Sequence, residues 1–299
     1  MTKKKVLVTG AGGFLGWNLC RTAVEDFNVI GVYHARPVVV KGVQGEKCDI
    51  TDFRALRELF LRIKPDAVIH AAAESKPDVC QERPDLTKKI NVDASLAIAG
   101  LCNDLQIPCA FTSSDLVFDG ASPPYKEECA LSPISVYGEQ KAAAEAGMRD
   151  RHGGTVICRM PLMYGDAPPQ AFSFIQPHIS SILAGKKLRL FFDAFRTPVS
   201  GSAAARGLLL ALGHTPDILH LGGRERLSRY DFGIKLARAL GRPDTPLTAI
   251  RQKDVVLRAP RPLDVSLDSS KAMALGYNPL PVDDELNAME CVKKALKRA

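Results

Sequence analysis

The segment TGAGGFLG, residues 9–16, constrains the fold of this 299-residue chain more than any other. It follows a short apolar run at 5–8 with the pattern of a buried strand, and it precedes an amphipathic stretch. Gly10, Gly13 and Gly16 lack β-carbons, which permits a tight turn and lets backbone N–H groups at a helix N-terminus meet a phosphate. The spacing G-x-x-G-x-x-G differs from the more familiar G-x-G-x-x-G, but the physical requirement is the same. The segment therefore predicts a strand–turn–helix unit that binds a pyrophosphate.

The first half of the chain alternates short β-branched runs with helical patterns. Strands are predicted at 5–8, 29–33, 67–70, 109–112 and 155–158, with a further one at 43–48. Helices are predicted at 14–25, 52–63, 84–105 and 136–151. Alternation of this kind is typical of βαβ units with right-handed crossovers. We predict an α/β fold with a doubly wound parallel sheet of the Rossmann type.

The second half is broken by prolines and glycines after Pro161. Helices are predicted at 175–183, 202–212 and 228–240, the last with Ser228 as its N-cap, and an amphipathic helix at 283–297. We expect residues 1–163 to form a dinucleotide-binding domain, rejoined by about 193–222. Residues 164–299 are expected to form mainly a smaller C-terminal substrate-binding lobe.

The composition bears on the cellular location of the protein and on the partners and metals that it can bind. No apolar run is long enough to span a bilayer, and the basic start is followed by an apolar run too short for a signal peptide, so we expect a cytoplasmic protein with no membrane partner. The eight cysteines are scattered without a C-x-x-C or a Cys/His cluster, so we expect no metal site.

The net charge of +7 comes from dispersed Lys and Arg residues, and the chain has a single Trp. This distribution argues against a nucleic-acid partner. It favours a mild positive field that steers small anionic ligands, although solubility alone also explains most of these charges.

A second informative segment, YGEQK, occupies residues 137–141. On a helix, Tyr137 and Lys141 lie one turn apart on the same face. A phenol is a weak acid–base catalyst at neutral pH, and a nearby ammonium group is expected to lower its pKa. Ser114 follows the strand at 109–112 and can donate a hydrogen bond to a substrate carbonyl. The three residues predict carbonyl reduction in which Tyr137 protonates the oxygen.

The end of the second strand bears on the choice of cofactor. His34 and Arg36 stand where an NAD-binding chain usually has an acidic residue for the ribose hydroxyls. A guanidinium group suits a 2′-phosphate, so we expect NADP(H) to be preferred over NAD(H). The alternative is that Arg36 points to solvent. For His70, at the end of the strand at 67–70, a structural role is favoured over a catalytic one.

Longer motifs resemble a known family. SSDLVFDG at 113–120 is similar to the S-T-D-Y-V-F-D-G segment of dTDP-4-dehydrorhamnose reductases, and PISVYG at 133–138 to their P-x-S-x-Y-G. Arg159 before the Tyr-Gly pair at 164–165, the DAFRTP segment at 193–198, and Arg261 before the Leu-Asp pair at 267–268 parallel further motifs of that family. The chain thus resembles the extended short-chain dehydrogenase/reductases, in particular this branch. It departs at Ser114, where the branch has Thr, at Leu116, where it has Tyr, and at GFLG, which is closer to sugar epimerases.

The resemblance implies a set of site residues. Ser114, Tyr137 and Lys141 are the expected catalytic residues. The expected cofactor-binding residues are Gly10, Gly13, Phe14, Leu15, Gly16, His34, Arg36, Asp49, Ile50, Ala71, Ala72, Ala73, Thr112, Tyr137 and Lys141. Asp49 is expected at the adenine, although Asp49 or Thr51 can instead cap the following helix. The expected substrate-binding residues are Lys76, Asp115, Arg196 and Arg261. Arg196 and Arg261 suit a diphosphate, but they suit equally well the buried carbonyls of the C-terminal lobe.

Three hypotheses about function stay open. The first is an NADPH-dependent reductase of a nucleotide-linked 4-keto-6-deoxy sugar, with hydride transfer to the carbonyl carbon. The second is an NAD(P)-dependent nucleotide-sugar epimerase or dehydratase, although no Glu follows Asp115 as a dehydratase commonly requires. The third is a non-enzymatic NADP-binding regulatory subunit similar to the methionine adenosyltransferase β subunit, which the chain resembles in RTP at 196–198, VDAS at 92–95 and PDV at 77–79. The resemblance also implies a homodimer, a small-molecule nucleotide-sugar or other carbonyl substrate, and room for Mg²⁺ with the substrate diphosphate.

Overall fold

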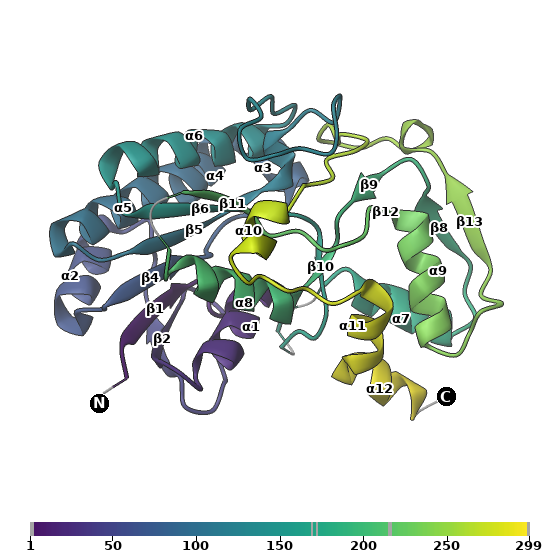
Figure 1. Cartoon of the computed structure of the whole chain (residues 1–299), viewed down its shortest axis with the longest axis horizontal. Coiled ribbons are helices and arrows are strands. Elements are labelled where there is room, and N and C mark those ends of the chain that lie inside the picture. Colours follow the sequence, from purple (N-terminus) through teal and green to yellow (C-terminus); the bar gives the residue numbers. More distant parts are fainter. Residues whose placement is uncertain (1–2, 169, 172, 215–216, 298–299) are drawn as a thin grey trace.

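A seven-stranded sheet forms the larger part of the computed structural model, which describes residues 3–168, 170–171, 173–214 and 217–297 (Figure 1). The strand order is β11-β6-β5-β4-β1-β2-β3, and every neighbouring pair is parallel. The strands are β1 (Lys5–Thr9), β2 (Asn28–Tyr33), β3 (Gln44–Lys47), β4 (Ala67–His70), β5 (Cys109–Ser114), β6 (Thr155–Met160) and β11 (Ile218–His220). The predicted fold class is confirmed, and the strand β11 is one that the sequence analysis did not predict.

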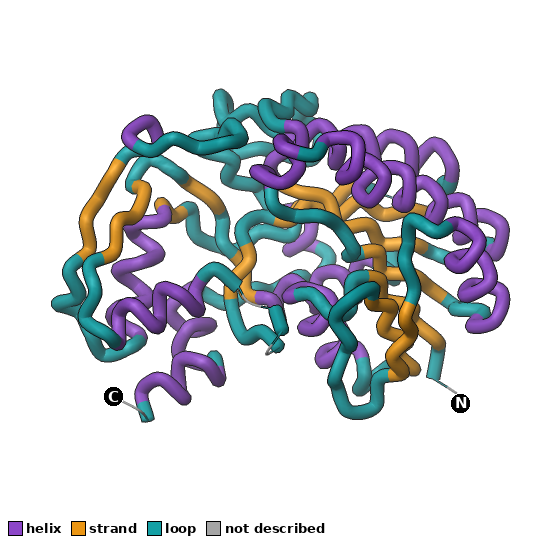
Figure 2. The backbone as a smooth tube through the Cα atoms, turned by 180° about the vertical axis from the view of Figure 1, so that it is seen from behind, coloured by secondary structure: helices purple, strands orange, loops and turns teal. Residues whose placement is uncertain are grey.

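Helices cover both faces of the sheet (Figures 1 and 2). One face carries α1 (Phe14–Ala23) and α8 (Gly201–Ala211), and the other carries α2 (Phe53–Ile63), α5 (Ala94–Leu105) and α6 (Val136–Arg151). Successive side chains of β1 alternate between the two cores: Val6 and Val8 pack with α1 and α8, whereas Leu7 packs with α2 and α5. Strands buried on both faces read as continuous apolar runs, which is why the sequence predicts them well.

The chain between β4 and α5 is more segmented than predicted. It forms α3 (Pro77–Glu82), α4 (Pro84–Lys88) and a π-helical turn, η1 (Lys89–Asp93), which leads directly into α5. The helix predicted over 84–105 is therefore present but contains a π turn, and the short helix α3 was not predicted. A proline at the first position of both α3 and α4 is compatible with a helix start, because that position needs no intrahelical N–H bond.

A smaller group of elements beyond the sheet has its own apolar core (Figure 1). It contains the helices α7 (Ile175–Leu183), α9 (Arg229–Ala239), α11 (Val282–Ala288) and α12 (Glu290–Leu296), and the parallel strands β8 (Leu188–Phe191) and β13 (Leu247–Ile250). Two short ladders connect this group to the sheet: β7 (Met163–Tyr164) with β10 (Val199–Ser200), and β9 (Phe195–Arg196) with β12 (Leu227–Ser228). The remaining short helices are η2 (Asp115–Val117), η3 (Gln252–Asp254) and α10 (Ser270–Ala274).

The chain crosses between the two groups more than once. After β9 it returns through α8, which packs against α1, to β11 at the edge of the large sheet. Residues 193–222 therefore include elements of the large sheet layer. The division into a dinucleotide-binding domain and a substrate-binding lobe, as functional units, stays a prediction.

The structure corrects two predictions about helix ends and confirms a third. The helix expected at 283–297 is broken at Met289, which takes extended dihedral angles between α11 and α12. The N-cap of α2 is Asp52, which accepts from the Ala55 N–H at 3.0 Å, and not Asp49 or Thr51. Ser228 caps α9 as predicted, with Asp231 completing a capping box.

A buried ion pair joins α6 to the neighbouring strand. The Arg159 guanidinium on β6 donates to the Glu145 carboxylate on α6, with Nη2 2.9 Å from Oε2. The two side chains are 3% and 4% exposed, and Arg159 Nη1 also donates to the Glu127 carbonyl at 3.1 Å. Because a buried charge without a partner is strongly unfavourable, this pair fixes the position of α6 against the sheet.

We predict that Glu145→Ala lowers the free energy of unfolding by about 3–5 kcal/mol, because it leaves the Arg159 charge buried and unpaired. Urea denaturation measures the loss. The matched control is Glu58→Ala, which removes the partner of Arg54 in a largely exposed pair and should cost less than about 1 kcal/mol. Equal losses in the two variants would contradict this account of α6.

Candidate active site

The glycine-rich turn lies between β1 and α1, as predicted. Gly10 has φ +70°, and a β-carbon there would lie 2.8 Å from the Ala72 backbone, so both the turn and its close approach to the segment after β4 require glycine. Helix α1 begins after Gly13, which has no side chain to accept from the first-turn amides, and that turn carries no acidic residue. An anionic pyrophosphate fits such a cradle of backbone donors at a helix N-terminus.

The end of β4 forms the wall opposite this turn. Thr9 Oγ1 accepts hydrogen bonds from the Ala71 and Ala72 N–H groups, each at 3.1 Å. Ala71, Ala72 and Ala73 are only half-buried and carry small side chains. Their backbone is therefore accessible beside the glycine-rich turn, with room for a ligand. The sequence predicted this role for 71–73 but not Thr9, which anchors the segment.

His70 is a structural residue. Its ring is fully buried, with Nδ1 2.7 Å from Thr9 Oγ1 and Nε2 2.9 Å from Ser95 Oγ. Burial lowers the pKa of His70 to about 3, so the imidazole is neutral at physiological pH. The ring ties β1, β4 and α5 together.

The residues predicted for the adenosine end meet beyond β2 and β3. His34 Nε2 lies 3.7 Å from Asp49 Oδ2. Ile50, the residue after Asp49, is buried. Hydrogen bonds from Thr51 lower the pKa of Asp49, which keeps it ionised. The Arg36 side chain is exposed, and its carbonyl lies so close to Gly12 that a β-carbon on Gly12 would be 1.9 Å away. This contact holds the loop bearing Arg36 against the phosphate turn; the sequence analysis had assigned Gly12 no role.

Ser114 and Tyr137 come together at the carboxyl end of β5. Ser135 caps α6 by accepting from the Gly138 N–H at 3.3 Å. Gly138 lets α6 lie directly on the turn after β5, since a β-carbon there would be 2.1 Å from the Leu116 carbonyl oxygen. The Ser114 hydroxyl lies close enough to the Tyr137 phenol, which is 7% exposed, to act on its pKa.

Lys141 lies one turn further along α6 and points to the same strand. Its Nζ donates to the Thr112 carbonyl at 2.6 Å and stands 4.4 Å from the centre of the Phe111 ring. Burial lowers the pKa of Lys141 to about 8. The structure thus brings the predicted residues Thr112, Ser114, Tyr137 and Lys141 to one end of β5.

One electrostatic expectation is wrong. Lys141 was expected to lower the pKa of Tyr137, but burial raises the pKa of this phenol above its ordinary value, and the neighbouring Ser114 side chain acts in the other direction. The physical reason is that burial disfavours the charged phenolate. Tyr137 is therefore a neutral phenol that carries the proton to be given, although burial makes it a weaker acid than a free phenol.

A polar brace lies behind α6. Asn91, in the π turn, donates to Gln140 Oε1 at 2.8 Å and accepts from the Glu74 N–H at 2.9 Å. Gln140 in turn donates to the Pro84 carbonyl and to Thr87 Oγ1, each at 3.0 Å. The sequence analysis gave Gln140 no role, although it lies inside the YGEQK segment. The brace fixes the helix that carries Tyr137 and Lys141.

The predicted substrate residues divide into two groups. Asp115 and Arg196 meet next to Ser114, with Arg196 Nε 3.4 Å from Asp115 Oδ2. Arg261 instead donates to Asp78 Oδ1 at 2.9 Å on α3, and Lys76 is exposed at the start of α3. Arg196 also donates to the carbonyls of Phe195, Pro262 and Leu263. These bonds are the ones expected if Arg196 holds the C-terminal lobe together.

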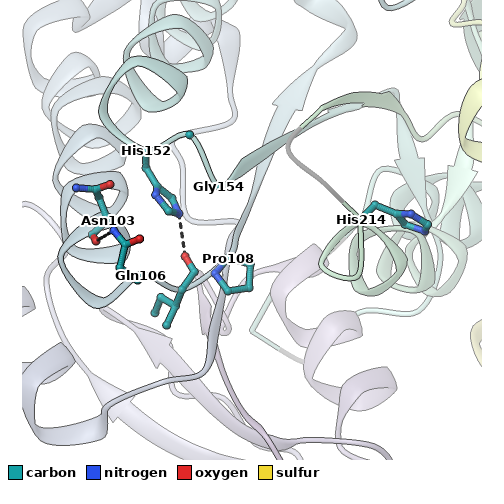
Figure 3. Close-up of a pocket in the computed structure, with 8 residues that line it drawn as sticks. Asn103, Gln106, Pro108, His152, Gly154 and His214 are labelled. Atoms are coloured by element: carbon teal, nitrogen blue, oxygen red, sulfur yellow. Dashed lines mark hydrogen bonds between the residues drawn. The ribbon is translucent and has the colours of Figure 1, made fainter.

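A separate pocket of about 420 Å³ opens at the opposite, amino-terminal edge of β5 and β6 (Figure 3). It is lined by Asn103, Gln106, Ile107, Pro108, His152, Gly153, Gly154 and His214. Within it, His152 Nε2 lies 2.8 Å from the Ile107 carbonyl oxygen. None of the predicted site residues lines this pocket.

Within the described ranges, no helix is both long and apolar enough to cross a membrane. The same residues contain no group of three or more His, Cys, Asp or Glu side chains arranged to hold a metal ion.

Comparison with known proteins identifies the family. The RmlD substrate binding domain model matches residues 4–293, so the chain belongs to this family of extended short-chain dehydrogenase/reductases. A probable low-salt glycan biosynthesis reductase from Haloferax volcanii is 31% identical over 289 residues, covering 95% of this chain and 96% of that protein. Methionine adenosyltransferase 2 subunit beta from Pongo abelii is 30% identical, covering 91% of this chain and 83% of that protein.

Solved structures agree with this assignment. A hypothetical dTDP-4-dehydrorhamnose reductase from Sulfolobus tokodaii has a TM-score of 0.82 and 30% identity, covering 93% of this chain and 98% of that one. A dTDP-4-dehydrorhamnose reductase from Bacillus anthracis, solved in complex with NADP, shares the fold with a TM-score of 0.85 at 20% identity, covering 96% and 99% of the two chains. The resemblance stated from the sequence motifs is confirmed.

The buried Lys141 gives a prediction about pH. Its pKa of about 8 in the folded protein lies below the ordinary 10.5, so the unfolded chain binds this proton more readily and folding is penalised while Lys141 is charged. The free energy of unfolding of the wild type, relative to Lys141→Met, should therefore rise as the pH increases from about 8 to about 10.5.

Urea denaturation across this pH range measures the difference. Lys186→Met, at an exposed lysine, is the control and should run parallel to the wild type. A difference between wild type and Lys141→Met that does not change with pH would show that Lys141 is not penalised by burial.

Proposed function

We propose that this protein is an NADPH-dependent reductase of a nucleotide-linked 4-keto-6-deoxy sugar. The observation that carries the proposal is the meeting of Ser114, Tyr137 and Lys141 at the end of β5, on the same sheet edge as the phosphate turn. Ligands of doubly wound sheets bind at this carboxyl edge. The family membership and the 30% identity to a hypothetical dTDP-4-dehydrorhamnose reductase support the sugar substrate.

In this proposal, residues 1–163 and the returning segment 193–222 bind the cofactor, and the lobe formed mainly by 164–299 binds the sugar nucleotide. The pyrophosphate lies on the turn of Gly10, Gly13 and Gly16, against the small residues at 71–73. The adenosine end lies between His34, Arg36 and Asp49. Bound NADPH supplies the hydride for the carbonyl carbon.

The chain's own residues act on the carbonyl oxygen. Ser114 donates a hydrogen bond to that oxygen, which stabilises the negative charge developing there. Tyr137, held neutral by burial, gives its phenolic proton to the same oxygen as the alcohol forms. Lys141 can stabilise the resulting phenolate through its positive charge, since both groups lie on one face of α6.

The proposal predicts NADPH oxidation when the purified protein is mixed with dTDP-4-keto-6-deoxyglucose, with a 3,5-epimerase supplied where reduction requires it. Tyr137→Phe should lower turnover by about 100-fold or more, because it removes the proton donor, and should leave NADPH affinity nearly unchanged. Absorbance at the nicotinamide band measures turnover, and calorimetric titration measures affinity.

The matched control is Tyr277→Phe, at a buried tyrosine whose hydroxyl donates to the Leu221 carbonyl. It should retain turnover. Undiminished turnover in Tyr137→Phe would remove this residue from the mechanism. Conversion of the sugar without net NADPH consumption would indicate an epimerase or dehydratase.

The same proposal includes a preference for NADPH over NADH. An exposed Arg36 beside the adenosine end can pair with a 2′-phosphate, so Arg36→Ala should weaken NADPH binding by about tenfold and hardly change NADH binding. Lys41→Ala, at an exposed lysine of the same connection, is the control. Tighter binding of NADH than of NADPH by the wild type would contradict the preference.

A second candidate is a non-enzymatic NADP-binding regulatory subunit. The 30% identity to methionine adenosyltransferase 2 subunit beta over most of both chains favours it. It requires a stable complex with a methionine adenosyltransferase catalytic subunit on gel filtration and no turnover with keto sugars. Turnover that depends on Tyr137 would favour the reductase instead.

A further inference from the structure

The catalytic hydroxyl groups of the proposed site lie beneath other parts of the chain. Ser114 is 6% exposed and Tyr137 is 7% exposed. A nucleotide-linked sugar has to touch both hydroxyl groups to be reduced, so part of the protein must move before such a substrate can enter. The segment that moves should be held by few apolar contacts and should lie at the carboxyl edge of the sheet, where ligands of this fold bind.

Residues 255–263, which we call the strap, meet these requirements. Figure 1 shows this yellow-green segment passing from the β13 side of the molecule toward α3, which follows β4. The strap also rests on the turn after η2, because a β-carbon on Gly120 would lie 3.0 Å from Pro262 Cβ. Both α3 and η2 pack against α6, the helix that carries Tyr137. The strap therefore joins two elements that lie beside the buried phenol.

Charged groups attach the strap to α3. Asp78 Oδ1 accepts from the Ala259 N–H at 3.1 Å and from Arg261 Nη2 at 2.9 Å. One turn further along α3, the Glu82 carboxylate pairs with the Arg258 guanidinium. The four charged side chains are between 21% and 72% exposed. Ion pairs that are open to solvent are individually weak and are screened by salt, so this attachment can be broken reversibly.

Apolar contacts of the strap are few. Within 255–263 only Ala259 and Pro262 are buried, and Val256 is 99% exposed. None of these residues belongs to the apolar clusters found in the described part of the chain. The chain on either side is held firmly, since β13 pairs with β8 and Val265 is fully buried in an apolar cluster. The strap thus has fixed ends and a weakly held middle, as a segment that opens and closes requires.

We propose that the strap is a gate over the active site, which opens to admit the substrate and which Asp78 holds closed, with Glu82 as a second point of attachment. Opening breaks the bonds to α3, lifts Pro262 from Gly120 and uncovers Tyr137. The inference rests on the proposed function for what passes the gate, but the opening itself needs neither substrate nor turnover. Asp78 acts through the strap and is a positioning residue, not a catalytic one.

Hydroxyl-radical labelling of the full-length protein, measured for each residue by mass spectrometry, tests the gate without a ligand. Tyr137 should be oxidised about threefold or more faster in Asp78→Asn than in the wild type, because loss of the charge weakens both bonds to the strap. Raising NaCl from about 0.05 M to about 0.5 M should also speed the labelling of Tyr137 in the wild type, because it screens the ion pairs. The internal reference is Tyr277, which is 3% exposed and should be labelled at an unchanged rate.

The matched control is Asp85→Asn. Asp85 follows Pro84 at the start of α4 just as Asp78 follows Pro77 at the start of α3, but Asp85 is exposed, and the arginines of the strap pair with α3 instead. This variant should label Tyr137 at nearly the wild-type rate. Equal labelling of Tyr137 in the wild type and in Asp78→Asn overturns the inference. An equal rise at Tyr277 also overturns it, because such a rise would show a general loosening of the fold.

A covalent lock tests whether opening is needed for turnover. Combining Glu82→Cys with Arg258→Cys provides two thiols that a short bismaleimide can join while the strap is closed. The cross-linked protein should oxidise NADPH with the keto sugar at least about tenfold more slowly than the same variant before cross-linking, and its Tyr137 should be labelled more slowly. Turnover that cross-linking leaves unchanged would overturn the gate. If the wild type shows no turnover at all, the proposed function fails, and the labelling of Tyr137 alone decides whether the strap is a gate.

Discussion

The close contact between Gly138 and the Leu116 carbonyl is the constraint on which the site depends. With a β-carbon only 2.1 Å from that oxygen, any other residue would force α6 away from the turn after β5. The contact sets the height of the helix above the strand and so brings the Tyr137 phenol to the Ser114 hydroxyl. The Asn91–Gln140 brace and the Glu145–Arg159 pair then hold the same helix at two further points.

The charged side chains that lie out of solvent fall into two groups, one that holds the fold together and one beside the proposed active site. Arg159 and Glu145 carry one positive and one negative charge and are joined by direct hydrogen bonds, as expected of a purely structural pair. Asp115 and Arg229, by contrast, leave one buried acceptor and one buried donor without a hydrogen-bond partner among the described residues. Unsatisfied polar groups of this kind gather at functional sites, where a ligand supplies the missing partner.

Much of the fold and part of the site could be predicted because their signals are local. The buried strands are apolar runs, α6 has the predicted bounds, and Tyr137 and Lys141 share a face through helical spacing alone. The break at Met289, the pairing of Arg261 with Asp78 and the position of Arg229 depend on contacts distant in sequence, which no local pattern encodes. The raised pKa of Tyr137 was missed for a similar reason, since it depends on burial by distant parts of the chain.

The most direct test compares Gly138→Ala with Gly147→Ala on the same helix. A β-carbon at Gly147 would meet only the flexible Leu96 side chain, at 2.9 Å, whereas one at Gly138 would meet backbone. Single-turnover oxidation of bound NADPH by the keto sugar should slow by about 100-fold or more in Gly138→Ala, with little change in NADPH affinity, and stay near the wild-type rate in Gly147→Ala. Equal rates in the wild type and Gly138→Ala would contradict the claim that this contact aligns Tyr137 with Ser114 for catalysis.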